Sequence, residues 1–286
     1  MEYALKVRDL TKNYDHFSLK KAGFSLPCGS IMGLIGENGA GKTTTIKLIL
    51  NMIKKDGGRI SILGKDADTD GENFKNEIGV VMEDSYFHDQ LKAGDVTRIM
   101  KLLYKKWDRA LFKQYLKKFN LPEGILIKEY SKGMKTKLSI AAALSHHPRL
   151  LILDEPTSGL DPVARSELTD IFLEYIQDDK NSILISSHIT SDMEKFADYV
   201  TYIHGGEIVL SESKDILLND YGILKCAKDD FARLSAEDVL GYRKSRFGCE
   251  ALVRDKKEME RKYRGFAIDH INIEDIMLFY AKGDQK

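Results

Sequence analysis

A glycine-rich stretch near residue 40 constrains the fold of this chain more than any other feature. Residues Gly36 to Thr43 fit the pattern GxxxxGK[ST] at every position. The apolar run Ile31–Ile35 comes before them and is typical of a buried parallel strand, and apolar residues at helical spacing follow. A strand, a glycine-rich loop and a helix in this order predict an α/β fold with a phosphate-binding loop at the edge of its sheet.

The spacing of residues within this loop has a physical reason. Glycines let the backbone curl so that successive N–H groups point inward at an anion, and the start of the helix adds its positive dipole end. Lys42 reaches the β- and γ-phosphates of a nucleotide, and the Thr43 hydroxyl can ligate Mg²⁺. A chance glycine-rich turn before a helix is the alternative, and the complete match in the expected context outweighs it.

A second apolar run ends in two carboxylates. Leu150–Leu153 reads as a buried strand, and Asp154 and Glu155 follow it directly. This order puts both acids at the carboxyl edge of a parallel sheet, where ligands bind in such folds. Asp154 would hold Mg²⁺, and Glu155 is placed to orient or deprotonate an attacking water. A solvated acidic turn explains the pair equally well in isolation, and the upstream loop favours the functional interpretation.

These features resemble the nucleotide-binding domain of ATP-binding cassette (ABC) transporters over about residues 1–212. The resemblance implies ATP and Mg²⁺ as cofactors. It identifies Tyr14 as the aromatic that stacks on adenine, Ser158–Asp161 as the D-loop, and His188 as the switch histidine, catalytic together with Glu155. The implied metal ligands are Thr43, Asp154 and Glu83, and the implied nucleotide-binding residues are Tyr14, Gly36, Glu37, Asn38, Gly39, Ala40, Gly41, Lys42, Thr43, Thr44, Glu83, Ser131, Gly133 and Asp161.

The chain departs from the family in its signature sequence. The family pattern is Leu-Ser-Gly-Gly-Gln, and this chain has Tyr130–Met134 in its place. Ser131 and Gly133 are kept, whereas Lys132 replaces the first glycine and Met134 the glutamine. Ser131 can still donate to a γ-phosphate from the helix N-terminus that it opens. We expect Lys132 either to add a positive charge near that phosphate or to point into solvent.

A second departure follows the strand predicted over Ile78–Met82. The family usually has a glutamine after this strand, and this chain has Glu83. A carboxylate still accepts a hydrogen bond from a water on Mg²⁺, but it adds a negative charge to the site. A solvent-facing loop acid is the alternative interpretation of Glu83.

Composition excludes several classes of protein. Lys and Arg total 44, as do Asp and Glu, so the formal net charge is zero, which argues against a basic nucleic-acid arm or a polybasic membrane patch. The 3 cysteines have neither disulfide-framework nor zinc-site spacing, and they favour a reducing, cytosolic setting. No window reaches 18 consecutive apolar residues, so no membrane span is predicted, and a membrane role would depend on a partner.

Strand and helix patterns predict two parts. Residues 1–213 form a P-loop NTPase (RecA-like) α/β core with an antiparallel β edge, interrupted by a helical subdomain at about 84–148. Helical patterning runs from Val96 to Phe119 within that subdomain, and His146 and His147 beside Pro148 are expected at the surface. Residues 214–286 form a small α+β accessory segment. Its predicted elements are a strand at Cys249–Val253, a charged helix at Asp255–Arg264 and an amphipathic helix at Ile273–Tyr280.

The resemblance implies a subunit that powers transport from the cytoplasmic face of the membrane. Two such domains, identical or different, would enclose two ATP molecules head to tail. A separate permease would place a cytoplasmic helix in a groove near Tyr86–Tyr115. The signature and the closing helix look most like bacterial exporter ATPases for peptides, antibiotics or other amphipathic substrates, and no nucleic acid is expected as a partner.

The main alternative is a soluble ABC ATPase that acts on a macromolecular complex. One cassette rather than two, no coiled-coil insertion, no zinc cysteines and no net basic charge argue against it. A P-loop kinase or GTPase is a weaker alternative, because those proteins lack the Ser131–Gly133 signature and the switch histidine His188.

Overall fold

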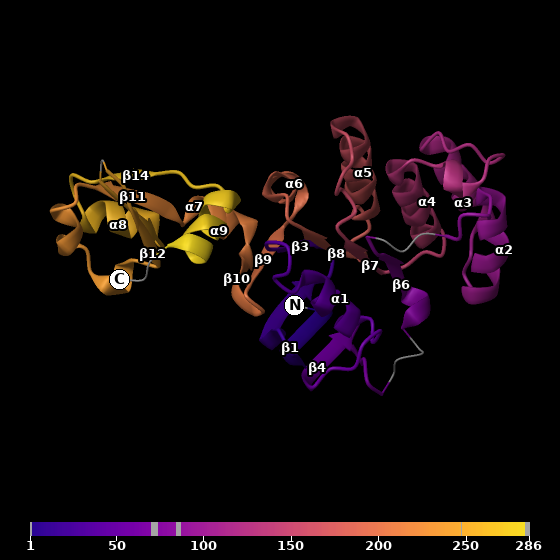
Figure 1. Cartoon of the computed structure of the whole chain (residues 1–286), viewed down its shortest axis with the longest axis horizontal. Coiled ribbons are helices and arrows are strands. Elements are labelled where there is room, and N and C mark those ends of the chain that lie inside the picture. Colours follow the sequence, from indigo (N-terminus) through magenta and orange to yellow (C-terminus); the bar gives the residue numbers. More distant parts are fainter. Residues whose placement is uncertain (1, 70–73, 84–86, 247, 284–286) are drawn as a thin grey trace.

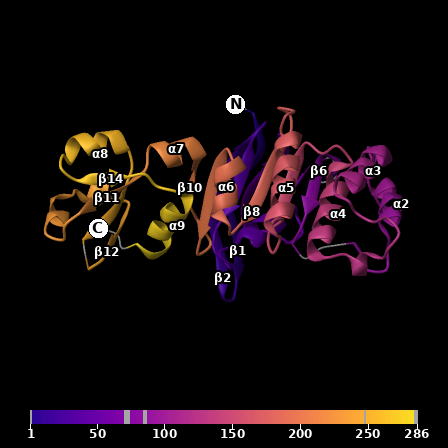
Figure 2. The same ribbon diagram turned by 90° about the horizontal axis from the view of Figure 1, so that it is seen from above.

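The computed structural model describes residues 2–69, 74–83, 87–246 and 248–283. Figures 1 and 2 show the helices α2–α4 and the C-terminal unit, which starts at residue 214, at opposite ends of the molecule, with two sheets between them. The strands are β1 (Tyr3–Tyr14), β2 (Phe17–Pro27), β3 (Ile31–Ile35), β4 (Gly57–Ile62), β5 (Lys65–Asp66), β6 (Ile78–Val81), β7 (Leu150–Asp154), β8 (Ser182–Ser187), β9 (Tyr199–His204), β10 (Glu207–Ser213), β11 (Gly222–Cys226), β12 (Gly241–Lys244), β13 (Cys249–Val253) and β14 (Ala267–Asp269). The α-helices are α1 (Lys42–Ile49), α2 (Ala93–Leu103), α3 (Arg109–Lys118), α4 (Lys132–Leu144), α5 (Pro162–Tyr175), α6 (Thr190–Phe196), α7 (Lys214–Asn219), α8 (Lys256–Lys262) and α9 (Ile273–Lys282), and the 3₁₀ helices are η1 (Lys75–Glu77), η2 (Ile127–Glu129), η3 (Asp230–Arg233) and η4 (Ala236–Asp238).

The central sheet has the strand order β10-β9-β3-β8-β7-β6. Strand β3 pairs in parallel with β8 and β9, β8 with β7, and β7 with β6, whereas β10 is antiparallel to β9. All residues of β3, β7 and β8 are buried, as apolar strands of a parallel sheet are when both faces are covered. Parallel strands end at one edge, so the loops that follow β3, β7 and β8 meet there.

The two faces of the central sheet belong to different buried clusters. Ile31 and Ile35 of β3 pack on the side of α4, α5 and α6. Met32 and Leu34 pack on the opposite side, together with α1 and the antiparallel sheet β2-β1-β4-β5. The predictions of a parallel α/β core and of an antiparallel edge are both confirmed.

The helical segment differs from the prediction of one helical pattern over Val96 to Phe119. Helix α2 ends at Leu103, and α3 begins only at Arg109. Asp108 explains the restart, because its Oδ1 accepts hydrogen bonds from the backbone N–H groups of Ala110 and Leu111 at 2.8 and 2.9 Å. A capped new helix is favoured over continuation of the old one at such a residue.

His146 is not at the surface as the sequence predicted, whereas His147 is exposed. The His146 ring is 1% exposed, stacks on Tyr104 with a centroid separation of 3.9 Å, and places Nε2 at 3.0 Å from the carbonyl oxygen of Ile78. Burial lowers the pKa of His146. The prediction was wrong because Pro148 follows this pair and suggested a loop, while the end of α4 turns the first histidine inward.

The C-terminal unit is built on the sheet β12-β13-β11-β14 and has its own buried cluster, which includes Leu224, Phe231 and Met259. The buried residues Ile273 and Phe279 of helix α9 belong instead to the cluster of the central sheet, together with Ile223 and Leu252 of the same unit. Within the part of the chain that the structure describes, no helix combines the length and the apolar character needed to cross a bilayer.

Candidate nucleotide-binding site

The glycine-rich loop joins β3 to α1, and its backbone requires glycine at two points. Gly41 has φ +116°, a conformation that residues with a side chain rarely adopt, and a Cβ there would lie 2.9 Å from the Phe17 ring. A Cβ on Gly36 would lie 2.4 Å from the carbonyl oxygen of Ile203. The loop therefore keeps its backbone tight against β9 and leaves its N–H side open to a ligand.

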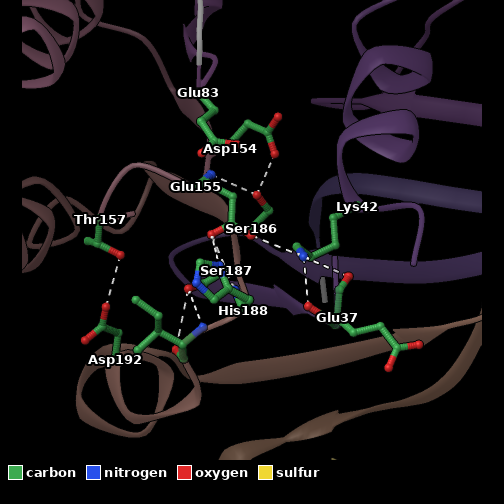
Figure 3. Close-up of polar contacts among 12 residues, drawn as sticks. Glu37, Lys42, Glu83, Asp154, Glu155, Thr157, Ser186, Ser187, His188 and Asp192 are labelled. Carbon is green, nitrogen blue, oxygen red and sulfur yellow. Dashed lines mark hydrogen bonds and ion pairs between the residues drawn. The ribbon is translucent and has the colours of Figure 1, made fainter. Parts of the chain in front are cut away.

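Lys42 begins α1 and is 5% exposed. Its ammonium donates hydrogen bonds to the carbonyl oxygens of Gly36 at 2.8 Å and Glu37 at 3.2 Å. The same nitrogen lies 3.2 Å from Glu155 Oε1. Two hydrogen bonds and one ion pair thus hold a buried cation at the base of the loop, with the charge of Glu155 as its counterion (Figure 3).

Asp154 ends β7 and is 1% exposed. Its Oδ1 accepts hydrogen bonds from the hydroxyl of Ser186 at 2.6 Å and from that of Thr43 at 3.2 Å. The Ser186 oxygen in turn accepts a hydrogen bond from the backbone N–H of Glu155 at 2.9 Å. Strands β7 and β8 and helix α1 therefore fix the carboxylate from three sides.

Glu155 and His188, predicted as the catalytic residues, lie together. Nδ1 of His188 is 2.8 Å from Glu155 Oε2, and the backbone N–H of His188 donates to the same oxygen at 3.4 Å. Because they follow the adjacent strands β7 and β8, the register of the sheet brings these two residues to one edge. The histidine is placed to orient the carboxylate, and about 40% of its side chain stays accessible.

Glu155 also carries backbone strain. Its φ is +49°, in the left-handed region, which costs a non-glycine residue on the order of 1–3 kcal/mol. Its Oε1 is buried and near enough to Lys42 for an ion pair, but no donor among the described residues is aligned to make a hydrogen bond to it. A buried carboxylate oxygen with a vacant acceptor position has the character expected of a group that receives a proton from water.

A cleft of about 550 Å³ opens over the loop. Its walls come from α1, the turn between β1 and β2, and the ends of β6 and β7. The lining residues are His16, Phe17, Asn38, Gly39, Gly41, Lys42, Thr43, Thr44, Glu83 and Glu155. The cleft therefore brings half of the predicted nucleotide-binding residues into one cavity, whereas Gly36 and Glu37 line a separate one. The size of the cleft suits a nucleotide.

The oxygen ligands at the base of this cleft fit Mg²⁺. Thr43 Oγ1 and Asp154 Oδ1 lie 3.2 Å apart, and hydroxyl and carboxylate oxygens are the ligands that this ion prefers. Among the described residues, no group of three or more His, Cys, Asp or Glu side chains is arranged to hold a metal.

Tyr14 lies beside the cleft rather than in its wall. Its side chain is 47% exposed, and its ring centroid is 6.5 Å from that of Phe17, which does line the cleft. Phe17 and His16 were not predicted as site residues. A second aromatic in the turn that follows Tyr14 was the signal that could have indicated them.

The signature residues gather at the start of α4, away from Lys42. Ser131 caps that helix, and its Oγ accepts a hydrogen bond from the N–H of Met134 at 3.2 Å. Lys132 Nζ lies 3.7 Å from Glu83 Oε1. Glu83 therefore connects the cleft that it lines to the signature helix, and the two departures from the family pattern contact each other.

The D-loop lies against the same helix. A Cβ on Gly133 would lie 3.3 Å from Leu160, and one on Gly159 would lie 3.8 Å from Lys132. Asp161 is the N-cap of α5, where its Oδ1 accepts hydrogen bonds from the N–H groups of Val163 and Ala164, both at 2.9 Å. The bond from Ala164 is the main reason that the pKa of Asp161 is lowered.

One polar contact behind the site was not predicted from sequence. Thr157, two residues after Glu155, donates a hydrogen bond to Oδ2 of buried Asp192 at 3.0 Å, and Nε of Arg165 lies 3.7 Å from the same oxygen. A lone aspartate inside an amphipathic helix gives no sequence signal of this kind, since its partners come from distant segments.

Comparison with known proteins supports these observations. Residues 19–158 match the family model described as ABC transporter. The chain is 33% identical over 212 residues to the bacitracin transport ATP-binding protein BcrA of Enterococcus faecalis, covering 73% of this chain and 69% of the relative. It is 34% identical over 214 residues to the lantibiotic transport ATP-binding protein SrtF of Streptococcus pyogenes, covering 74% of this chain and 91% of the relative.

Solved structures give the same result. The structure of an ATP-binding subunit of an ABC transporter superposes with a TM-score of 0.67 at 29% identity, covering 75% of this chain and 91% of that chain. The structure of cbiO1 from Clostridium perfringens, described as part of the ABC transporter complex cbiONQ, superposes with a TM-score of 0.64 at 27% identity. It covers 75% of this chain and 90% of that chain.

Proposed function

Because this chain belongs to the ATP-binding subunits of ABC transporters and is an ATPase, we propose that it powers a separate membrane permease through the cleft over Lys42. In this proposal the loop from Gly36 to Thr43 binds the phosphates and Glu155 is the general base. His188 orients Glu155 and contacts the γ-phosphate. Thr43 and Asp154 hold Mg²⁺, which supplies charge neutralisation for the phosphates when bound.

The role of Glu155 as general base is inferred from one observation: Lys42 and His188 each contact a different oxygen of its carboxylate. Glu155 Oε1 faces the ammonium at 3.2 Å, and Oε2 faces the imidazole at 2.8 Å. A phosphate that enters the loop competes with Glu155 for Lys42, since both are anions. Binding thereby releases Oε1 toward water while His188 keeps the carboxylate oriented, as a base for hydrolysis requires.

We propose that two such subunits close over ATP. Ser131 and Gly133 lie at the start of α4 and are not among the residues that line the cleft of the same chain. A second subunit would bring its own signature helix over the nucleotide, so that ATP favours the closed dimer and hydrolysis releases it. Lys132 would then add a positive charge beside the phosphates.

A surface on the helical segment suits the permease. A groove of about 170 Å³ is lined by Val80, Phe87, Met100, Tyr104, Ser139, Ala142, Ala143 and His146. Leu102 and Leu103 near the end of α2 are 87% and 64% exposed. Exposed apolar side chains beside a groove favour a protein contact. Tyr86, where the groove was predicted to begin, lies outside the described residues.

The transported substrate is proposed from the relatives alone. Two of them are named as bacitracin and lantibiotic transport ATP-binding proteins. We propose that the permease driven by this chain moves a peptide antibiotic or another amphipathic substrate out of the cell, with the chain at the cytoplasmic face of the membrane.

Reconstitution with a candidate permease of about six membrane spans, sought in the gene neighbourhood, tests the proposal. We expect the two proteins to purify together and the amphipathic substrate to stimulate ATP hydrolysis. Leu102→Glu should weaken the complex while leaving basal hydrolysis intact, and Leu173→Glu, an exposed leucine on α5, is the matched control. Hydrolysis that ignores the membrane protein, with no complex formed, would contradict the transporter role.

A further inference from the structure

Helix α6 lies between the proposed catalytic residues and the C-terminal unit. It begins at Thr190, two residues after His188, and ends at Phe196. Figures 1 and 2 place it beside the central sheet on the side of the C-terminal unit, near α9. A displacement of α6 would therefore be transmitted directly to the backbone of His188.

The first polar contact of α6 reaches the segment that carries Glu155. Asp192 is 1% exposed, and its Oδ2 accepts a hydrogen bond from Thr157 Oγ1 at 3.0 Å (Figure 3). Arg165 of α5 approaches the same oxygen at 3.7 Å. Thr157 follows Glu155 by two residues, and α6 itself follows His188 by two residues, so α6 is joined to the segments that carry both proposed catalytic residues.

The second polar contact of α6 reaches the C-terminal unit. Oε1 of Glu194 accepts a hydrogen bond from the backbone N–H of Ile273 at 2.8 Å, at the first residue of α9. A carboxylate at a helix N-terminus is stabilised by the helix dipole. In addition, Lys214 Nζ at the start of α7 donates to the carbonyl oxygen of Glu194 at 3.0 Å.

Apolar packing makes this contact firm. Ile273, Ile276 and Phe279 of α9 are each 1% exposed and share a buried cluster with Phe196 and Tyr202. On the other side of α9, the Arg243 guanidinium lies 4.0 Å from the centre of the Phe279 ring, which joins the helix to β12. Helix α9 is therefore packed against both parts of the molecule.

A cavity lies between α9 and the segment from His188 to Ser191, which are not closely packed there. It has a volume of about 450 Å³ and is lined by Gly36, Glu37, His188, Ile189, Thr190, Ser191, Tyr202, Glu274, Met277, Leu278 and Ala281. The segment from His188 to Ser191 thus has room to move on its α9 side. Close packing with α9 is thus confined to the end of α6, where Phe196 lies in the shared cluster, and is missing at its start.

From these contacts we infer that the C-terminal unit sets the rate of hydrolysis through α6, with Glu194 as the positioning residue that joins them. Glu194 holds α6 to α9, and α6 holds His188 and Thr157 in register beside Glu155. The inference rests on the roles proposed above for Glu155 and His188. It assigns residues 214–286 a part in catalysis rather than a purely structural one.

The experiment measures kcat and KM for ATP in the full chain and in variants at this contact. Glu194→Ala removes the acceptor, and we expect kcat to fall roughly tenfold, less than the ~100-fold that a misplacement of about 1 Å can cost. KM should stay within twofold, because the phosphate loop is untouched. Glu194→Gln retains an oxygen acceptor and should restore most of kcat, and Lys195→Ala, an exposed neighbour on α6, is the matched control.

A second route breaks the same hydrogen bond from α9. Ile273→Pro removes the donor, and proline is well tolerated at the first position of a helix. Because Ile273 is buried, the change also removes an apolar side chain, so Ile273→Ala, which keeps the N–H, is the control and should retain kcat. We expect the same selective loss of kcat in Ile273→Pro, and this variant decides the matter if Glu194→Ala does not fold. The inference is overturned if kcat is unchanged in the variant without the hydrogen bond, or if KM rises by as large a factor as kcat falls. It is also overturned if the Gln variant is as slow as the Ala variant.

His188→Ala separates this inference from the proposed function. If His188→Ala leaves kcat unchanged, the role proposed for the histidine fails, and the inference that depends on it falls too. If His188→Ala is slow and Glu194→Ala matches the wild type, only the link to the C-terminal unit is overturned.

Discussion

One lysine–glutamate pair lies inside the candidate site and another lies at its edge, and the two pairs differ in burial. Lys42 and Glu155 lie 3.2 Å apart with side chains 5% and 6% exposed. Lys132 and Glu83 lie 3.7 Å apart with side chains 43% and 35% exposed. The first pair is embedded among loop and strand, whereas the second joins two segments at the surface.

This difference in burial decides what each pair does. Removing one partner from a buried pair costs about 3–5 kcal/mol of stability, because the other charge is left without a counterion. An exposed pair contributes only about 0–1 kcal/mol. The buried pair therefore fixes the positions of two reactive groups. The exposed pair can break and form at little cost in free energy, as a contact that changes during the ATPase cycle requires.

Glu155→Gln should have the largest effect on the buried pair. The amide keeps the size of the side chain but loses its basicity, so hydrolysis should fall by about 10²–10⁴-fold, the usual contribution of a general base. ATP should still bind and stabilise dimers, which size exclusion can detect. Near-normal hydrolysis by this variant would remove Glu155 as the base.

Lys42→Ala tests the other half of the buried pair. It should abolish tight nucleotide binding and also lower the free energy of unfolding by about 3–5 kcal/mol, because Glu155 stays buried without its cation. Nucleotide titration and denaturant unfolding measure the two effects. An affinity within twofold of the wild type would show that the loop does not bind phosphate through this lysine.

Variants of the exposed pair should have small effects on stability and a selective effect on function. Glu83→Ala and Lys132→Ala should each change the free energy of unfolding by less than about 1 kcal/mol. We expect Glu83→Gln to bind ATP normally, and Glu83→Ala to bind ATP but to lose stimulation by the permease or its substrate. A Glu83→Ala complex stimulated as strongly as the wild type would leave Glu83 as a surface residue.

High salt should weaken the exposed pair and leave the buried pair nearly unchanged, and this is the smallest effect that we expect. At 1 M ionic strength the Debye length falls to about 3 Å, which screens charges in contact with water and affects buried ones much less. The coupling energy of Lys132 and Glu83, measured by a double-mutant cycle in denaturant unfolding, should therefore vanish in high salt. A coupling that persists would mean that this pair is shielded from solvent.

The sequence predicted those site residues whose positions depend only on the neighbouring residues in the chain. Gly36 to Thr43, Asp154 and Glu155 occupy loop and strand-end positions, and such positions follow from apolar runs and turn residues. The sheet register then brings His188 to Glu155, since β7 and β8 are neighbours. The resemblance, rather than the spacing, indicated His188.

Contacts between distant segments could not be predicted in this way. The pair of Lys132 and Glu83 was visible in the sequence only as two separate departures from the family pattern. The link from Glu194 to α9 crosses 79 positions of the sequence. No periodicity encodes a hydrogen bond of this kind, because it depends on how finished elements pack. The buried position of His146 was missed for the same reason.

The membership of α9 in the buried cluster of the central sheet has a consequence for how the protein is made. A ribosome adds about 5–20 residues per second, so several seconds separate the synthesis of β10 from that of α9. During that interval Phe196 and Tyr202 lack the helix that covers them. The nascent ATPase therefore exposes an apolar face until its C-terminal helix emerges, and a chaperone or the permease itself would find that face accessible only on newly made chains.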